Sequence, residues 1–140
     1  MRDASPKRRR RGDKDIVLDR DENGRVYASL PWTIRHYGVE NFDWGYIGPA
    51  TAELALNVLD TILPPGVDGE PAIPCEEGEC SATTWRLHRS FMAEFLVRVP
   101  YEGGCLAEAD IRRWILHRFD DGHGVEVAPS ARWLSTFAPR

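Results

Sequence analysis

The chain has 140 residues, of which 42% are hydrophobic and 29% are charged. This balance is typical of one globular domain and excludes a collagen-like or wholly disordered chain. No apolar stretch reaches the length of about 18–20 residues that a membrane-spanning helix needs. The basic start of the chain also lacks the apolar segment of a secretory signal. We therefore expect a cytoplasmic protein without membrane contact.

Charge is distributed unevenly along the chain. Residues 1–15 hold seven Lys and Arg against three Asp, which leaves 11 basic and 19 acidic residues elsewhere. Residues 1–14 contain almost no apolar side chain, so we expect a disordered basic arm there, followed by one acidic domain over 15–140. The arm carries a run of five cationic residues: Lys7, Arg8, Arg9, Arg10 and Arg11.

The first ordered element is a predicted β-hairpin. Residues 16–18 and 25–30 are short apolar runs, and Asn23-Gly24 lies between them. Asn-Gly is a strong hairpin signal because both residues tolerate positive φ. Pro31 ends the second strand, and an irregular, aromatic-rich segment over 32–47 is expected to fold back onto the core.

A first helix is predicted to begin at Gly48 and Pro49, because Pro is favoured at the first helical position. Apolar residues recur at helical spacing up to Leu63, and Pro64-Pro65-Gly66 ends the helix. Residues 64–83 show no periodicity and are expected to form a long loop.

A second helix is predicted from Thr83 or Thr84 to Pro100, since either threonine can cap it. Gly103-Gly104 is expected to form a turn before a third helix over 106–119. Residues 120–140 form a predicted tail with a candidate short helix at 131–134. These elements predict an α+β fold, in which an N-terminal hairpin or small antiparallel sheet packs against about three helices.

Metal binding is the first candidate chemistry. Cys75 and Cys80 lie in an acidic loop, and His88 and Cys105 could complete four ligands. A structural zinc site normally has two paired halves, and neighbouring glutamates raise thiol pKa values. We therefore expect no metal and no other cofactor, and interpret the cysteines as thiols or as a Cys75–Cys80 bridge.

Catalytic motifs are missing from the sequence. It has no Gly-x-Ser-x-Gly elbow, its four histidines lie in different predicted elements, and Gly45 to Pro49 lacks the P-loop Lys. His88 is expected to be a hydrogen-bonded core residue. The chain is accordingly predicted not to be an enzyme.

The segment Phe42-Asp43-Trp44-Gly45-Tyr46, followed by Leu54-Ala55-Leu56, resembles an uncharacterised family of small prokaryotic and phage proteins. That family has Phe-Asp/Glu-Trp-Gly-Tyr, a glycine-rich segment and Leu-Ala-Leu. The likeness spans about residues 25–116, and Gly48-Pro49-Ala50-Thr51 replaces its usual Gly-Ser-Gly-Pro. The resemblance implies an accessory protein of a prokaryote, phage or plasmid and supplies no catalytic residue. Apart from the resemblance, the residue types of Phe42, Trp44, Gly45 and Tyr46 indicate a structural segment that packs the loop against the first helix.

Two functions follow as expectations. The acidic domain favours a non-enzymatic protein that binds a host protein, for example at a basic groove that otherwise holds nucleic acid. The alternative is an accessory DNA- or RNA-binding protein that acts through Lys7 to Arg11, because flexible cationic arms neutralise phosphates.

Overall fold

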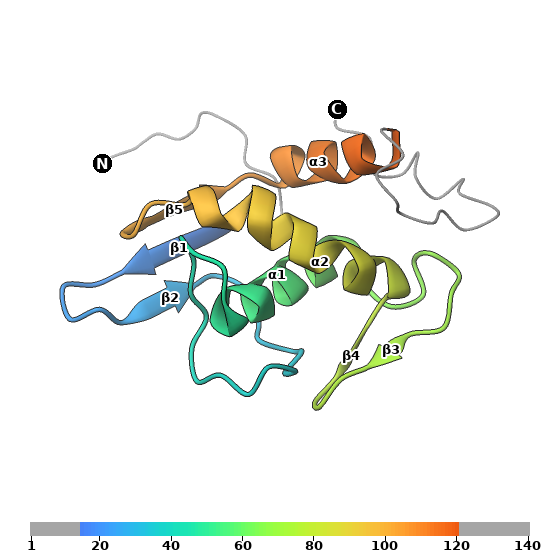
Figure 1. Ribbon diagram of the computed structural model, residues 1–140, viewed down its shortest axis with the longest axis horizontal. Coiled ribbons are helices and arrows are strands. Elements are labelled where there is room, and N and C mark those ends of the chain that lie inside the picture. The colour runs from blue at the N-terminus through green and yellow to red at the C-terminus, as the bar shows by residue number, and fades with distance from the viewer. Residues whose placement is uncertain (1–14, 121–140) are drawn as a thin grey trace.

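The computed structural model describes residues 15–120. Three strands, β1 (Ile16–Arg20), β2 (Val26–Ala28) and β5 (Gly103–Leu106), form an antiparallel sheet in the order β2-β1-β5. Three α-helices accompany it, with α2 lying between α1 and α3 in the view of Figure 1. The predicted α+β class is therefore confirmed. The predictions for residues 1–14 and for the tail beyond residue 120 fall outside the described part of the chain.

The predicted hairpin is confirmed, although its turn differs from the one expected. The Asp21 carboxylate accepts hydrogen bonds from the backbone N–H groups of Asn23 and Arg25, at 2.8 and 2.9 Å. Gly24 has φ of 82°, whereas no non-glycine residue of the described chain has positive φ. A two-residue Asn-Gly turn would need positive φ at both residues, so this turn is of another type.

Helix α1 (Pro49–Ile62) begins as the sequence predicts, with Gly48 as N-cap and Pro49 as the first helical residue. Most of the helix is buried, because the sheet, α2 and the segment over 31–37 surround it. Three of its buried residues are polar: Thr51, Glu53 and Asn57. Asn57 accepts the N–H groups of Thr33 and Ile34, both at 3.0 Å.

Glu53 is another buried polar residue of α1. Its carboxylate accepts the N–H groups of His36 and Tyr37, at 2.9 and 2.8 Å, and the Trp32 indole N–H, at 2.9 Å. Every one of these donors lies in the irregular segment after β2. Glu53 and Asn57 therefore hold that segment against the helix through hydrogen bonds, in addition to the expected aromatic packing.

Helix α2 (Ala82–Glu94) differs from its prediction at both ends. Ser81, rather than Thr83 or Thr84, is the N-cap and accepts the Thr84 N–H at 3.0 Å. The chain leaves the α-helix after Glu94 and continues as a short 3-10 helix, η1 (Leu96–Arg98). Pro100 disfavours helical geometry at the residue before it, so the α-helix cannot extend to that proline.

The prediction of a turn at Gly103-Gly104 is wrong, because these glycines begin strand β5. Gly103 pairs with Asp19 of β1 and has φ of 109°. A Cβ atom at Gly103 would clash with the Leu18 carbonyl oxygen, so only glycine permits this approach. Helix α3 (Glu108–Asp120) consequently begins two residues later than predicted, after Leu106 has completed the strand.

The predicted long loop over 64–83 is irregular only in part, and its last two residues already belong to α2. This segment contains a short hairpin of β3 (Ile73–Pro74) and β4 (Glu79–Cys80). Its turn pairs with the segment after β2, since Arg35 and Glu77 exchange backbone hydrogen bonds of 2.9 Å. Within residues 15–120, no helix is both long and apolar enough to cross a membrane.

Candidate interaction surface

An arginine of β1 lies between two aromatic rings at one end of the sheet. The Arg20 guanidinium carbon is 4.7 Å from the Trp44 ring centre and 4.0 Å from the Tyr101 ring centre. Its Nε donates to the Tyr101 carbonyl at 2.8 Å, and the side chain is only 7% exposed. Arginine stacks well on aromatic faces because its guanidinium is planar and weakly hydrated.

Asp43 completes this arrangement as the acceptor. It accepts from Arg20 Nη2 at 2.7 Å, from the Trp44 N–H at 2.9 Å and from the Tyr46 hydroxyl at 2.9 Å. Burial alone would raise the Asp43 pKa, but these hydrogen bonds and the Arg20 charge outweigh burial and lower it. The hydrogen bond to Asp43 in turn raises the pKa of Tyr46.

The Trp-Gly-Tyr segment connects the loop to more elements than expected. Trp44 is buried in the core shared with α1, but its indole N–H donates to the carbonyls of Pro100 and Tyr101, at 2.9 and 3.1 Å. The Gly45 N–H donates to the Leu96 carbonyl at 3.1 Å. Hydrogen bonds therefore attach the segment to the connection between α2 and β5, whereas its link to α1 is by packing.

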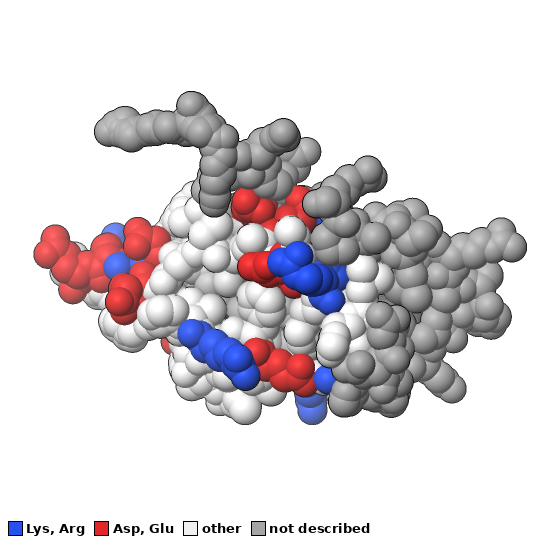
Figure 2. All heavy atoms as spheres, turned by 90° about the horizontal axis from the view of Figure 1, so that it is seen from above, with Lys and Arg blue, Asp and Glu red and all other residues white. Residues whose placement is uncertain are grey.

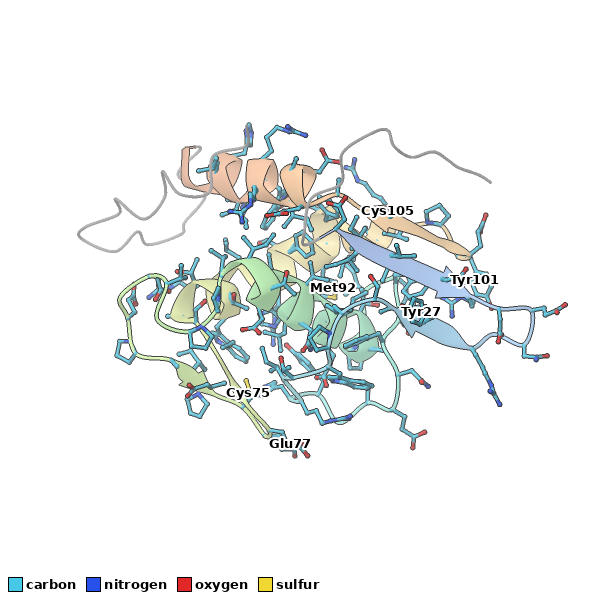
Figure 3. The ribbon with its side chains drawn as sticks, turned by 180° about the vertical axis from the view of Figure 1, so that it is seen from behind. Tyr27, Cys75, Glu77, Met92, Tyr101 and Cys105 are labelled. Atoms are coloured by element: carbon cyan, nitrogen blue, oxygen red, sulfur yellow. The ribbon has the colours of Figure 1, made fainter. Side chains whose placement is uncertain are left out.

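Three large apolar side chains remain exposed beside this cluster. They are Tyr46, Ile47 and Tyr101, at 48%, 67% and 68% exposure. The Tyr101 hydroxyl lies 4.0 Å from the position of a Cβ atom added to Gly24, which places Tyr101 against the β1–β2 turn. Figure 3 shows Tyr101 at the same end of the molecule as Tyr27.

Acidic residues surround these exposed side chains. Asp21, Glu22 and Glu102 are exposed in the β1–β2 turn and just before β5. Figure 2 shows acidic side chains gathered at this end of the molecule. We call the surface formed by Tyr46, Ile47, Tyr101 and these three acids the aromatic–acidic end.

Tyr27 lies on the opposite face of the sheet. It pairs with Asp19 of β1, whereas Arg20 is the next residue along that strand. Because successive side chains of a strand point to opposite faces, Tyr27 and the Arg20–Tyr101 stack are separated by the sheet. Tyr27 is 58% exposed and is therefore a matched comparison for Tyr101.

The cysteine and histidine candidates for metal binding are not brought together. Cys75 and Cys80 belong to one small cluster beneath the β3–β4 hairpin, and Cys105 is exposed on β5 (Figure 3). Burial raises the pKa of both hairpin thiols, that of Cys80 to about 12, which disfavours the thiolate form. In residues 15–118, whose side chains are described, no three His, Cys, Asp or Glu are grouped to hold a metal ion.

His88 is a buried, hydrogen-bonded histidine, as its helix position suggests. Its Nδ1–H donates to the Trp85 carbonyl at 2.7 Å, so Nε2 of the neutral ring accepts a hydrogen bond from the Tyr37 hydroxyl, 2.6 Å away. Burial lowers the His88 pKa to about 4. The ring is therefore neutral near pH 7.

Sequence reasoning identified Phe42, Trp44, Gly45 and Tyr46 but missed Arg20 and Tyr101. Arg20 is 23 residues from Asp43 and 81 residues from Tyr101. No local spacing connects residues so far apart, and their association arises only when β1 pairs with β5.

Comparison with protein-family models, curated proteins and solved structures finds no match. The resemblance through the Trp-Gly-Tyr segment thus stays a prediction. The same holds for nucleic-acid binding through Lys7 to Arg11, which lie outside the described residues.

Proposed function

We propose that this chain is a non-enzymatic, cytoplasmic interaction protein that binds a basic protein partner through the aromatic–acidic end. The observation that carries the proposal is the fixed presentation of Tyr46 and Tyr101 around the Arg20–Asp43 ion pair, whose Nη2–Oδ1 distance is 2.7 Å. Exposed tyrosines held by buried contacts lose little conformational entropy when they bind.

The chemistry of the surface favours a protein partner. Tyrosine is enriched among residues that contribute most to protein–protein binding, and the surrounding acids steer a positively charged partner toward them. A nucleic acid would be repelled by the three exposed carboxylates, so the phosphate-binding alternative gains no support from this surface.

Selection from a displayed peptide library against the immobilised full chain tests the proposal. We expect the enriched peptides to be basic and to lose affinity at high salt. Tyr101→Ala should weaken their binding at least about tenfold, as expected for a central interface residue. Tyr27→Ala removes an equally large exposed ring from the opposite face and should leave binding unchanged. Peptides whose binding tolerates Tyr101→Ala would place the interaction elsewhere.

A further inference from the structure

A concave site lies at the other end of β1 from Arg20. It is a pocket of about 320 Å³ between the start of β1, the segment after β2 and the C-terminal half of α1. Polar residues make up most of its lining: Asp15, Ser29, Thr33, Asn57, Asp60 and Thr61. Ile16, Leu30 and Pro31 supply an apolar wall. The pocket therefore combines two carboxylates and several hydroxyls with a hydrophobic surface.

Asp60 is the pocket residue whose hydrogen-bonding capacity is least satisfied. Its Oδ1 atom is shut off from solvent and has no hydrogen-bond partner in the described structure. Burial raises the Asp60 pKa, and a hydrogen bond with Thr33 only partly opposes that effect. An unpaired, solvent-excluded carboxylate oxygen is unfavourable, and a positive charge in the adjoining pocket would lessen that cost.

The position of Asp60 in α1 is also unfavourable. It lies in the last turn of the helix, where the macrodipole is negative, and that turn contains no basic residue. Residues that break a local rule of stability without compensation are frequently functional. A cation in the pocket would interact favourably with Asp60 and with the helix end at the same time.

The second carboxylate, Asp15, strengthens the preference for a cation. Its Oδ1 accepts the backbone N–H of Glu108 at 2.7 Å, which fixes the side chain beside the pocket. The Ser29 hydroxyl accepts the Val17 N–H at 2.8 Å and retains a lone pair for a donor. The acceptors are thus distributed around the pocket, whereas Ile16, Leu30 and Pro31 suit an aliphatic stem.

We propose that this pocket binds the guanidinium group of an arginine side chain. Arginine offers five N–H donors in one plane for the carboxylates and hydroxyls, and its methylene stem can pack on the apolar wall. Two sources share this chemistry: an arginine of a partner, or one of Arg8 to Arg11, which precede Asp15 by four to seven residues. Four residues of extended chain span up to about 14 Å, so the chain's own arginines are within reach.

Titration of the isotope-labelled full chain with N-acetyl-arginine amide, followed by amide chemical shifts, tests the site. The uncharged isostere N-acetyl-citrulline amide is the ligand control. Protein variants are Asp60→Asn, which keeps the side-chain size, Asp15→Asn, and Glu76→Gln as a matched exposed-carboxyl control on the β3–β4 turn. A full-length chain with Arg8 to Arg11 replaced by Gln tests whether the chain's own arginines compete for the pocket.

We expect saturable shifts at the pocket residues with the arginine ligand, and at least tenfold weaker binding in Asp60→Asn, with Glu76→Gln unchanged. Tighter binding after neutralisation of the arm identifies the chain's own arginines as the occupant, and unchanged binding identifies a partner's arginine. Absence of saturation in both full-length chains would overturn the proposal. So would equal binding of the citrulline analogue, or undiminished binding by folded Asp60→Asn and Asp15→Asn.

Discussion

The guanidinium carbon of Arg20 lies 4.0 Å from the centre of the Tyr101 ring, although 81 residues separate the two in the chain. This stack joins the first strand to the turn before the last strand. The Asp43 carboxylate extends the stack to the Trp-Gly-Tyr segment through its 2.7 Å contact with Arg20 Nη2. Fold stability and the proposed binding surface therefore depend on the same arginine.

Arg20→Met should destabilise the protein by about 2–4 kcal/mol, because Asp43 would lose its cation while remaining partly buried. Arg20→Lys should also destabilise it, since an ammonium group cannot bond Asp43 and the Tyr101 carbonyl while stacking between two rings. Urea unfolding at pH 7 measures both effects. The exposed Arg25→Met on the same hairpin is the control and should shift the free energy of unfolding by less than about 0.5 kcal/mol. An equal loss in Arg20→Met and Arg25→Met would contradict the account of the stack.

His88 should make stability depend on pH below neutrality. Burial lowers its pKa from 6.5 to about 4, so the unfolded chain binds a proton between these values while the folded protein does not. The His88 contribution is therefore fully present above pH 6.5 and is lost as the pH falls toward 4, with a slope of at most about 1.4 kcal/mol per pH unit. Urea unfolding of wild type and His88→Gln from pH 4 to pH 7 separates this contribution. If the free energy of unfolding of His88→Gln kept the wild-type dependence on pH, that dependence would belong to other groups.

The two glycines of β5 should respond oppositely to alanine. Gly103→Ala would place a methyl group against the Leu18 carbonyl at a φ of 109°, and we expect a loss of at least about 2 kcal/mol. An added Cβ at Gly104 meets nothing within 4 Å. Gly104→Ala should consequently be neutral or stabilise by up to about 1 kcal/mol, because it restricts the unfolded chain. Thermal unfolding of the two variants is a direct check. Similar losses of stability at both positions would mean that β5 does not pair with β1 in this register.

Asp60→Asn should stabilise the protein near neutral pH, in contrast to most substitutions of partly buried residues. The folded-state pKa of Asp60 lies above 3.8, so ionisation costs stability as the pH rises through that folded pKa. Relief of the unfavourable helix-dipole interaction alone is worth about 0.3–1 kcal/mol. The gain should disappear below pH 3.8, where both states are protonated. Destabilisation by Asp60→Asn at pH 7 would show that the carboxylate is structural.

Local signals in the sequence were sufficient for the first hairpin and for α1. Gly24, with its positive φ, allows the turn although the two-residue Asn-Gly type does not form, and Gly48-Pro49 encodes the helix start through its own backbone preferences. Strand β5 was not predictable in the same way, because Gly103-Gly104 has a turn-like composition and becomes a strand only through pairing with β1. The β3–β4 hairpin likewise depends on its pairing with the segment after β2.

The candidate surface was predictable only in part. The aromatic segment was visible as a pattern, but its partners Arg20 and Tyr101 come from distant positions. The sequence does carry one signal of how this segment docks: Glu53 and Asn57 stand four residues apart in a stretch, 52–59, whose other residues are apolar. Two polar residues on neighbouring turns of a buried helix indicate hydrogen bonding to another segment, which the structure confirms.

Binding of a basic protein partner at the aromatic–acidic end is the proposed function of this protein. The most direct test is the dissociation constant of a peptide selected on the wild-type chain, measured by isothermal titration for Tyr101→Ala and Tyr27→Ala. We predict that Tyr101→Ala raises Kd at least about tenfold while Tyr27→Ala leaves it within about twofold of the wild-type value. Equal values for the two variants would contradict the claim and exclude this end as the binding surface.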